Sequence, residues 1–156
     1  MSPYIVKGGK YIFGWSKVSE KGEIKIPKEA YDEYGLATDR QVILSSGSKT
    51  SGGFGVSSFR ILKNSKIEEL LVNFPSLINY QLAEGEIIII KGKKYCWLKI
   101  NDDMSINLPE TTLDAFGIKK GELLLSGRGS YLAIAFIAKG PIFNEAKKHC
   151  ELEYFI

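Results

Sequence analysis

Residues 11–48, YIFGWSKVSEKGEIKIPKEAYDEYGLATDRQVILSSGS, decide the architecture, because a diverged copy of this stretch recurs at residues 95–130. An internal duplication shapes the whole fold, so it is established before any motif. Trp15 and Trp97, the two tryptophans of the chain, lie 82 positions apart. The same offset aligns five further identities, which are Lys17 with Lys99, Pro27 with Pro109, Gly35 with Gly117, Gly47 with Gly129 and Ser48 with Ser130.

Both copies predict the same order of short elements. In the first copy, β-prone runs at 10–18 and 23–26 are joined by a glycine-containing turn. Pro27 ends the second run and suits the first turn of a helix at 28–34, which Gly35 closes. A strand at 41–44, a loop rich in glycine and serine at 47–55 and an apolar run at 56–62 follow.

The second copy predicts strands at 95–100, 105–108, 122–125 and 131–138, with a helix at 110–116 that Gly117 caps. Between the copies, Ser65 is the expected N-cap of a connecting helix at 66–72, which Pro75 ends. A last helix is expected at 143–149.

The expected fold class is mainly β with short helices (α+β). The chain divides into a first repeat at 1–62, a helical connector at 63–86, a second repeat at 87–141 and a C-terminal helix and tail at 142–156. One repeat buries too little surface to be stable alone. The two repeats are therefore expected to form one compact body related by a pseudo-twofold axis.

Residues 18–30, VSEKGEIKIPKEA, continued by Tyr34-Gly35-Leu36 and by residues 39–42, DRQV, resemble the swapped-hairpin AbrB-like family of prokaryotic regulators. This family includes the SpoVT/AbrB proteins, the MazE-type antitoxins and MraZ-like members with two copies in one chain. The second copy keeps Leu108-Pro109 and Phe116-Gly117-Ile118, while Met104 stands in place of the turn glycine. The resemblance implies a tandem-duplicated swapped-hairpin β-barrel whose basic residues contact DNA.

The positive charge is concentrated in the leading hairpin of each copy. Residues 1–25 carry +3 and residues 91–107 carry +2, in a chain with a net charge of +3. These charges predict contacts with the phosphates of double-stranded DNA. The predicted DNA-binding residues are Lys7, Lys10, Lys17, Lys21, Lys25, Arg40, Lys91, Lys93, Lys94 and Lys99.

Other interpretations of the same residues stay open. The lysines also fit the solvated face of a sheet, and Trp15 and Trp97 fit a core better than a base-stacking platform. Arginine, the commonest reader of guanine, is absent after the turn glycine and from the first helix. Arg40 is therefore the best candidate for a base or phosphate contact, unless it pairs with Asp39 or Glu33.

The predicted function is a DNA-binding transcriptional regulator. The first alternative is a non-catalytic barrel module that binds a protein partner or small ligand, and the second is an antitoxin-type regulator. The apolar run at 131–137 fits either a core strand or the edge of a homo-oligomer. The loops at 47–53 and 127–130 fit either mobile turns or an anion cradle.

Catalysis, metal binding and membrane insertion are not indicated. The sequence has no phosphate-binding loop, nucleophile elbow or dinucleotide fingerprint, so neither an enzyme nor a cofactor is expected. Cys96, Cys150 and His149 are too few for a tetrahedral zinc site. No apolar run approaches the ~20 residues of a membrane-spanning helix, and the N-terminus lacks the features of a signal peptide. We therefore expect a cytoplasmic protein.

Overall fold

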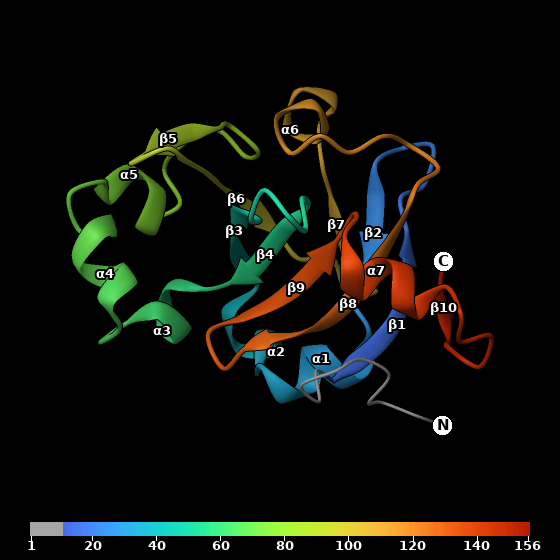
Figure 1. Ribbon diagram of the computed structural model, residues 1–156. Coiled ribbons are helices and arrows are strands. Elements are labelled where there is room, and N and C mark those ends of the chain that lie inside the picture. Colours follow the sequence, from blue (N-terminus) through green and yellow to red (C-terminus); the bar gives the residue numbers. More distant parts are fainter. Residues whose placement is uncertain (1–10) are drawn as a thin grey trace.

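Short strands and helices alternate along residues 11–156, the part of the chain that the computed structural model describes (Figure 1). The first copy forms β1 (Ile12–Lys17), β2 (Glu23–Lys25), α1 (Lys28–Glu33), α2 (Leu36–Asp39), β3 (Gln41–Ser46) and β4 (Phe54–Ser57). The connecting segments are α3 (Phe59–Leu62), α4 (Lys66–Leu71), α5 (Pro75–Ile78) and β5 (Ile88–Ile90). The second copy and the tail form β6 (Lys93–Lys99), β7 (Ser105–Asn107), α6 (Glu110–Ala115), β8 (Leu123–Ser130), β9 (Ala133–Ile137), α7 (Pro141–Ala146) and β10 (Tyr154–Phe155).

The expected fold class, a mainly β swapped-hairpin barrel with a pseudo-twofold axis, is wrong. Within residues 11–156, eight strands form one mixed sheet in the order β10-β1-β8-β9-β4-β3-β6-β5, and seven short helices accompany it. The pairings within residues 11–156 leave β10 and β5 as open edges, so no closed barrel is found. The physical reason is that β2 and β7 leave the sheet and pair only with each other, while β5 and β10 lengthen its edges.

Nevertheless, strands of one copy pair with strands of the other, and two of these pairings have the same register. β1 of the first copy pairs with β8 of the second, and Trp15 faces Leu125. In the reciprocal pair, β6 of the second copy runs beside β3 of the first, and Trp97 faces Ile43. Adding 82 to the numbers of Trp15 and Ile43 gives Trp97 and Leu125. The leading strand of each copy is thus held by the other copy.

The core has three parts because the sheet is buried on both faces. Alternate side chains of β3 point to opposite faces of the sheet. Val42 and Leu44 belong to a central cluster that also contains residues of α1, α6 and the two-stranded sheet of β2 and β7, called the β2–β7 ribbon. Ile43, between them, joins a cluster under α3–α5. A third cluster, which includes Ile12 and Leu125, lies under α7. The main sheet is therefore the middle layer of the molecule.

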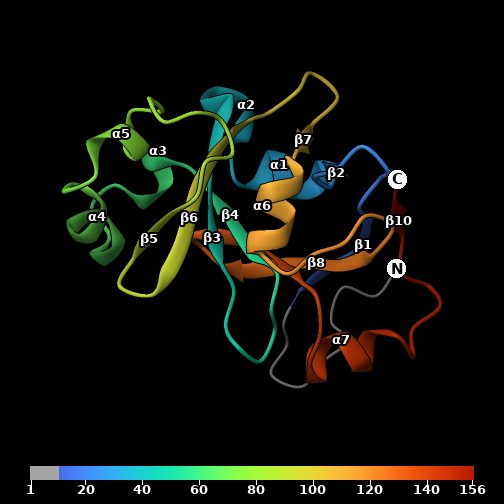
Figure 2. The ribbon, with the colours of Figure 1, turned by 90° about the horizontal axis from the view of Figure 1, so that it is seen from above.

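Helical segments cover the two ends of the sheet. Figures 1 and 2 show α3–α5 at one end of the molecule and α7 with β10 at the other. Trp97 packs edge-on against Tyr80, with ring centroids 5.7 Å apart, and its Nε1 donates to the Leu82 carbonyl at 2.7 Å. Trp15 packs edge-on against Phe143 of α7 at 5.1 Å. The two tryptophans therefore attach the covering segments to the sheet.

Local signals in the sequence located several elements correctly. The Ser65 hydroxyl accepts the Ile67 N–H at the start of α4, which confirms the predicted N-cap. Gly35 and Gly117 take φ values of +65° and +71° after α1 and α6. Pro75 follows α4, as expected, but also begins α5.

One local expectation is wrong, and the structure decides two points that the sequence left open. The apolar run at 56–62 divides between the end of β4 and the short helix α3, which Ser58 caps by accepting the Ile61 N–H. Residues 127–130 form the end of β8 and not a loop. The apolar run at 131–137 supplies β9, an interior strand between β8 and β4, so it is not an edge open to a second copy.

Candidate nucleic-acid interface

The β2–β7 ribbon presents one apolar and one polar face. Ile24 and Ile106 are register partners and are fully buried in the central cluster. Because neighbouring side chains on a strand alternate, the other ribbon residues point away from that cluster. Glu23 lies opposite Asn107, and Lys25 lies opposite Ser105. The ribbon thus turns a charged and polar surface outward.

Lysines at equivalent places of the two copies flank this ribbon. Lys17 ends β1 just before the turn into β2, and Lys99 ends β6 just before the turn into β7. Both side chains are exposed. The duplication therefore sets one cation on each side of the ribbon.

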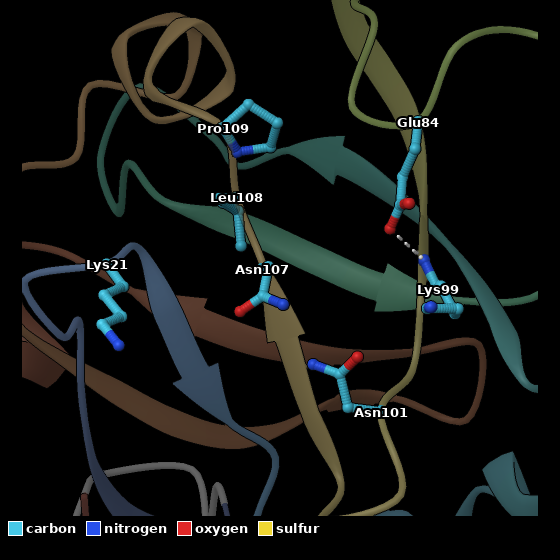
Figure 3. A pocket seen from close by; sticks show the side chains of 7 residues that line it. All are labelled: Lys21, Glu84, Lys99, Asn101, Asn107, Leu108 and Pro109. Carbon is cyan, nitrogen blue, oxygen red and sulfur yellow. Dashed lines mark hydrogen bonds between the residues drawn. The ribbon is translucent and has the colours of Figure 1, made fainter.

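Three hollows in the surface lie beside the ribbon or beside the turn that leads into β7. The central hollow, about 300 Å³, is drawn in Figure 3 and is lined by Lys21, Glu84, Lys99, Asn101, Asn107, Leu108 and Pro109. The Arg40 hollow, about 500 Å³, shares Lys99 and Asn101 with it and adds Asp39, Arg40, Gln41, Ile100 and Asp102. The Lys17 hollow, about 230 Å³, is lined by Lys17, Ser19, Glu20, Glu23, Lys25 and Ile156.

Five of the ten predicted DNA-binding residues are therefore brought to this region. They are Lys17, Lys21, Lys25, Arg40 and Lys99. Within residues 11–156, none of these five side chains forms an ion pair or donates a side-chain hydrogen bond. The expected pairing of Arg40 with Asp39 does not form, because Arg60 occupies that carboxylate. The Arg60 guanidinium donates to the two Asp39 oxygens at 2.9 and 2.8 Å.

The other predicted residues lie elsewhere. Lys93 begins β6 and Lys91 lies in the turn before it, at the end of that strand remote from Lys99. Lys94 donates its Nζ to the Ala115 carbonyl at 2.9 Å, where it satisfies the C-terminal turn of α6. Lys7 and Lys10 lie outside the described residues.

Carboxylates are interspersed among the cations, and most are already engaged. The Asp39 side chain is only 8% exposed and is neutralised by Arg60. Glu84 accepts the backbone N–H of Lys99 at 2.9 Å (Figure 3), and Glu23 accepts the Ser105 hydroxyl at 3.3 Å. Beside the ribbon, the hydroxyl of Ser105 also bonds Asp103 and holds the pKa of that carboxyl below its usual value. Glu20, Glu84, Asp102 and Asp103 are the exposed acids of the region, and Glu20 and Asp102 accept no hydrogen bond from the cations described.

Aromatic and basic residues near α1 serve packing. The Tyr11 hydroxyl donates to Glu29, a bond that raises the pKa of Tyr11 to about 12. The Arg128 guanidinium lies 4.5 Å from the centre of the Tyr11 ring and makes a bidentate pair with Glu33 at 2.6 and 2.7 Å. These contacts fasten α1 to β8.

The cysteines and the glycine-rich hairpin have structural surroundings. Cys96 is buried, and burial raises the pKa of its thiol to about 12, while Cys150 is exposed. In the part of the chain that is described, no group of three or more histidine, cysteine, aspartate or glutamate residues could hold a metal ion. Backbone groups of the 47–53 hairpin loop form hydrogen bonds with one another. The Gly47 N–H donates to the Gly53 carbonyl, and the Gly52 N–H donates to the Ser48 carbonyl.

Asn101, Asn107 and Glu84 were not among the predicted site residues. For Asn107 a signal was present in the sequence, because alternation turns this position away from the core that the apolar Ile106 enters. Glu84 had no comparable signal, since it comes from the connector and reaches the hollow only through tertiary packing.

No family model, curated protein or solved structure that was compared with this chain matches it. Among residues 11–156, no helix has both the length and the apolar character needed to cross a membrane.

Proposed function

We propose that this protein is a cytoplasmic DNA-binding regulator that contacts the phosphates of double-stranded DNA around the β2–β7 ribbon. The contacting residues are Lys17, Lys21, Lys25, Arg40 and Lys99. One observation carries the proposal: five cations that form no ion pair within residues 11–156 line three hollows around the outward face of one two-stranded ribbon.

The electrostatics support backbone contacts in particular. Cations that form no ion pair within residues 11–156 break none when they approach a phosphate, and they release counterions from the duplex. Lys25 differs slightly, because its charge also acts on Asp103. Asp39 adds little opposing charge, because Arg60 neutralises it in a nearly buried position. Lysine positions a protein on the duplex without reading its sequence, so this term alone gives sequence-independent affinity.

The width of the ribbon supports the same function. A two-stranded β-ribbon fits the major groove of B-form DNA, and several DNA-binding folds use one in this way. With the ribbon in the groove, Lys17 and Lys99 on its two sides would face the two phosphate backbones.

Titration of the full chain into random-sequence duplex at several salt concentrations tests the proposal. The logarithm of the association constant is expected to fall linearly with the logarithm of the salt concentration. Replacing Lys17, Lys21, Lys25 and Lys99 together by glutamine is expected to lower the slope by about 3 to 4, roughly 0.9 per lost phosphate contact.

A matched control removes the same charge elsewhere. Lys63, Lys66, Lys91 and Lys93 are exposed and lie outside the three hollows. Glutamine at these four positions is expected to leave most of the slope in place. Equal losses in the two variants would reject the assigned face, and no binding at low salt would reject DNA as the partner.

A second candidate function is a module that binds a protein partner. It is favoured by the mixed charge of the region, since the hollows are lined by five carboxylates as well as five cations. Such a surface complements a partner of mixed charge better than a polyanion. This candidate is favoured if the protein binds neither random nor selected duplex at low salt.

A further inference from the structure

Asn107 is an exposed amide on the outward face of the ribbon. It ends β7 opposite Glu23, and its neighbour Ile106 is fully buried, so alternation turns the Asn107 side chain away from the core. Figure 3 shows its amide in the central hollow, between Lys21 and Asn101.

The two asparagines of this hollow differ in their hydrogen bonding. The Nδ2 of Asn101 donates to the Ser105 hydroxyl at 3.0 Å, which fixes that amide in place. Asn107 makes no side-chain hydrogen bond within residues 11–156. Its carbonyl oxygen and its amino group are therefore both available to a ligand.

An adjacent donor and acceptor on one planar group match a single base edge. Adenine presents N7 as an acceptor and its 6-amino group as a donor in the major groove, and asparagine pairs with both at once. We propose that Asn107 reads an adenine in the major groove, with Lys21 and Lys99 holding the flanking phosphates. This inference rests on the proposed DNA binding and adds a base preference to it.

Glu84 favours a base edge over a phosphate inside the hollow. Its carboxylate lines the same space and is held by the Lys99 N–H. A phosphate placed there would be repelled by this carboxylate, whereas the amino group of a base would not. The lysines therefore act at the rim of the hollow and Asn107 acts within it.

Selection of binding sites from a randomised duplex library, carried out with the full chain, tests the assignment. The selected pool is expected to show one position enriched in adenine. Asn107→Ala is expected to lose that preference and to bind the selected duplex about tenfold more weakly, with little change on random duplex. Asn144→Ala, at an exposed position of α7, is the matched control and is expected to behave like the parent.

A second variant keeps the shape of the side chain and changes its chemistry. Asn107→Asp carries only acceptors, so its preference is expected to move from adenine toward cytosine, which offers the N4 donor. The inference is overturned if Asn107→Ala keeps the adenine preference, or if the selected pool shows no base preference. In either case, salt-dependent binding of the parent to random duplex would leave the proposed function standing. Absence of all duplex binding by the parent protein overturns the proposed function as well.

Discussion

Ile24 of β2 and Ile106 of β7 are direct register partners, and both side chains are fully buried. They occupy the same position in the two copies of the repeat, 82 residues apart. The ribbon that carries the candidate site is thus built from one short strand of each copy. Neither copy alone has a partner strand for it.

This pairing makes Ile106 a determinant of stability. Ile106→Ala removes buried methyl groups from the central cluster and is expected to cost about 2–5 kcal/mol in the free energy of unfolding. Ile89→Ala is the control, because Ile89 is 65% exposed on the edge strand β5, and it is expected to change stability by less than about 0.5 kcal/mol. Urea denaturation measures both. Equal effects would contradict the burial of the ribbon.

The turns that lead into the ribbon use different residues in the two copies. Gly22 and Met104 hold the equivalent left-handed position, with φ of +79° and +67°. A Cβ on Gly22 would lie 2.5 Å from the Leu108 carbonyl oxygen, so Gly22→Ala is expected to cost about 1–3 kcal/mol.

Met104→Gly relieves the left-handed strain at the second turn and is expected to leave the free energy of unfolding unchanged or to raise it by up to about 1 kcal/mol. Thermal and urea unfolding of the two variants provide the measurement. A loss of stability in Met104→Gly as large as in Gly22→Ala would show that the two turns are not equivalent.

Tyr34 couples stability to alkaline pH. Its hydroxyl donates to the carbonyls of Ser130 and Ala133 at 2.5 and 3.1 Å, and burial raises its pKa to about 12. An unfolded tyrosine has a pKa of about 10, so the folded state holds this proton more tightly. The corresponding stability is complete below pH about 10 and is lost as the pH rises toward 12.

Tyr34→Phe removes this dependence. At pH 8 it is expected to cost about 1 kcal/mol for the lost hydrogen bonds. Between pH 9 and pH 11 the parent is expected to lose more stability than the variant, because only the parent contains Tyr34. Tyr11, Tyr80 and Tyr95 titrate in both proteins, so they do not contribute to the difference. Parallel curves of unfolding free energy against pH would contradict the role of Tyr34.

The two thiols are expected to react differently. Cys150 is exposed, whereas Cys96 is fully buried and its pKa is raised to about 12. An alkylating reagent at pH 8 should therefore modify one thiol in the native protein and both in denaturant, since the thiolate is the reactive form. Mass spectrometry of the labelled peptides identifies the site. Rapid native labelling of Cys96 would contradict its place in the central cluster.

Two lysines at opposite ends of β6 test where the proposed interface lies. Lys99→Gln is expected to lower the slope of log affinity against log salt by about 1, while Lys93→Gln, at the other end of the strand, leaves it nearly unchanged. Fluorescence anisotropy with a labelled random duplex measures both slopes. A larger effect at Lys93 than at Lys99 would move the interface to the other end of β6.

Much of the local structure was predictable from particular residues. Pro27 and Pro109 end the ribbon strands, Gly35 and Gly117 cap the following helices, and Ser65 starts α4, because each of these effects acts within a few residues. The prediction of a closed barrel was wrong. It depended on how β2, β5, β7 and β10 pair across long sequence separations, and local preferences do not determine such pairing.

The candidate site divides in the same way. The sequence identified Lys17, Lys21, Lys25, Arg40 and Lys99 as candidate contacts, but it also grouped Lys91, Lys93 and Lys94 with them. Lys93 and Lys99 belong to one strand, and only its length and direction place them at opposite ends. Arg60, which neutralises Asp39, comes from α3 and reaches that carboxylate only through packing.

The sequence by itself determined that the chain is duplicated and where several of its short elements lie. These features rest on local backbone preferences and on a matched series of residues. Only the tertiary structure decided that the sheet stays open, in which order its strands pair, and which cations surround one ribbon. Those outcomes depend on which apolar faces pack together across more than eighty residues of chain, and that competition is settled by burial and not by any local signal.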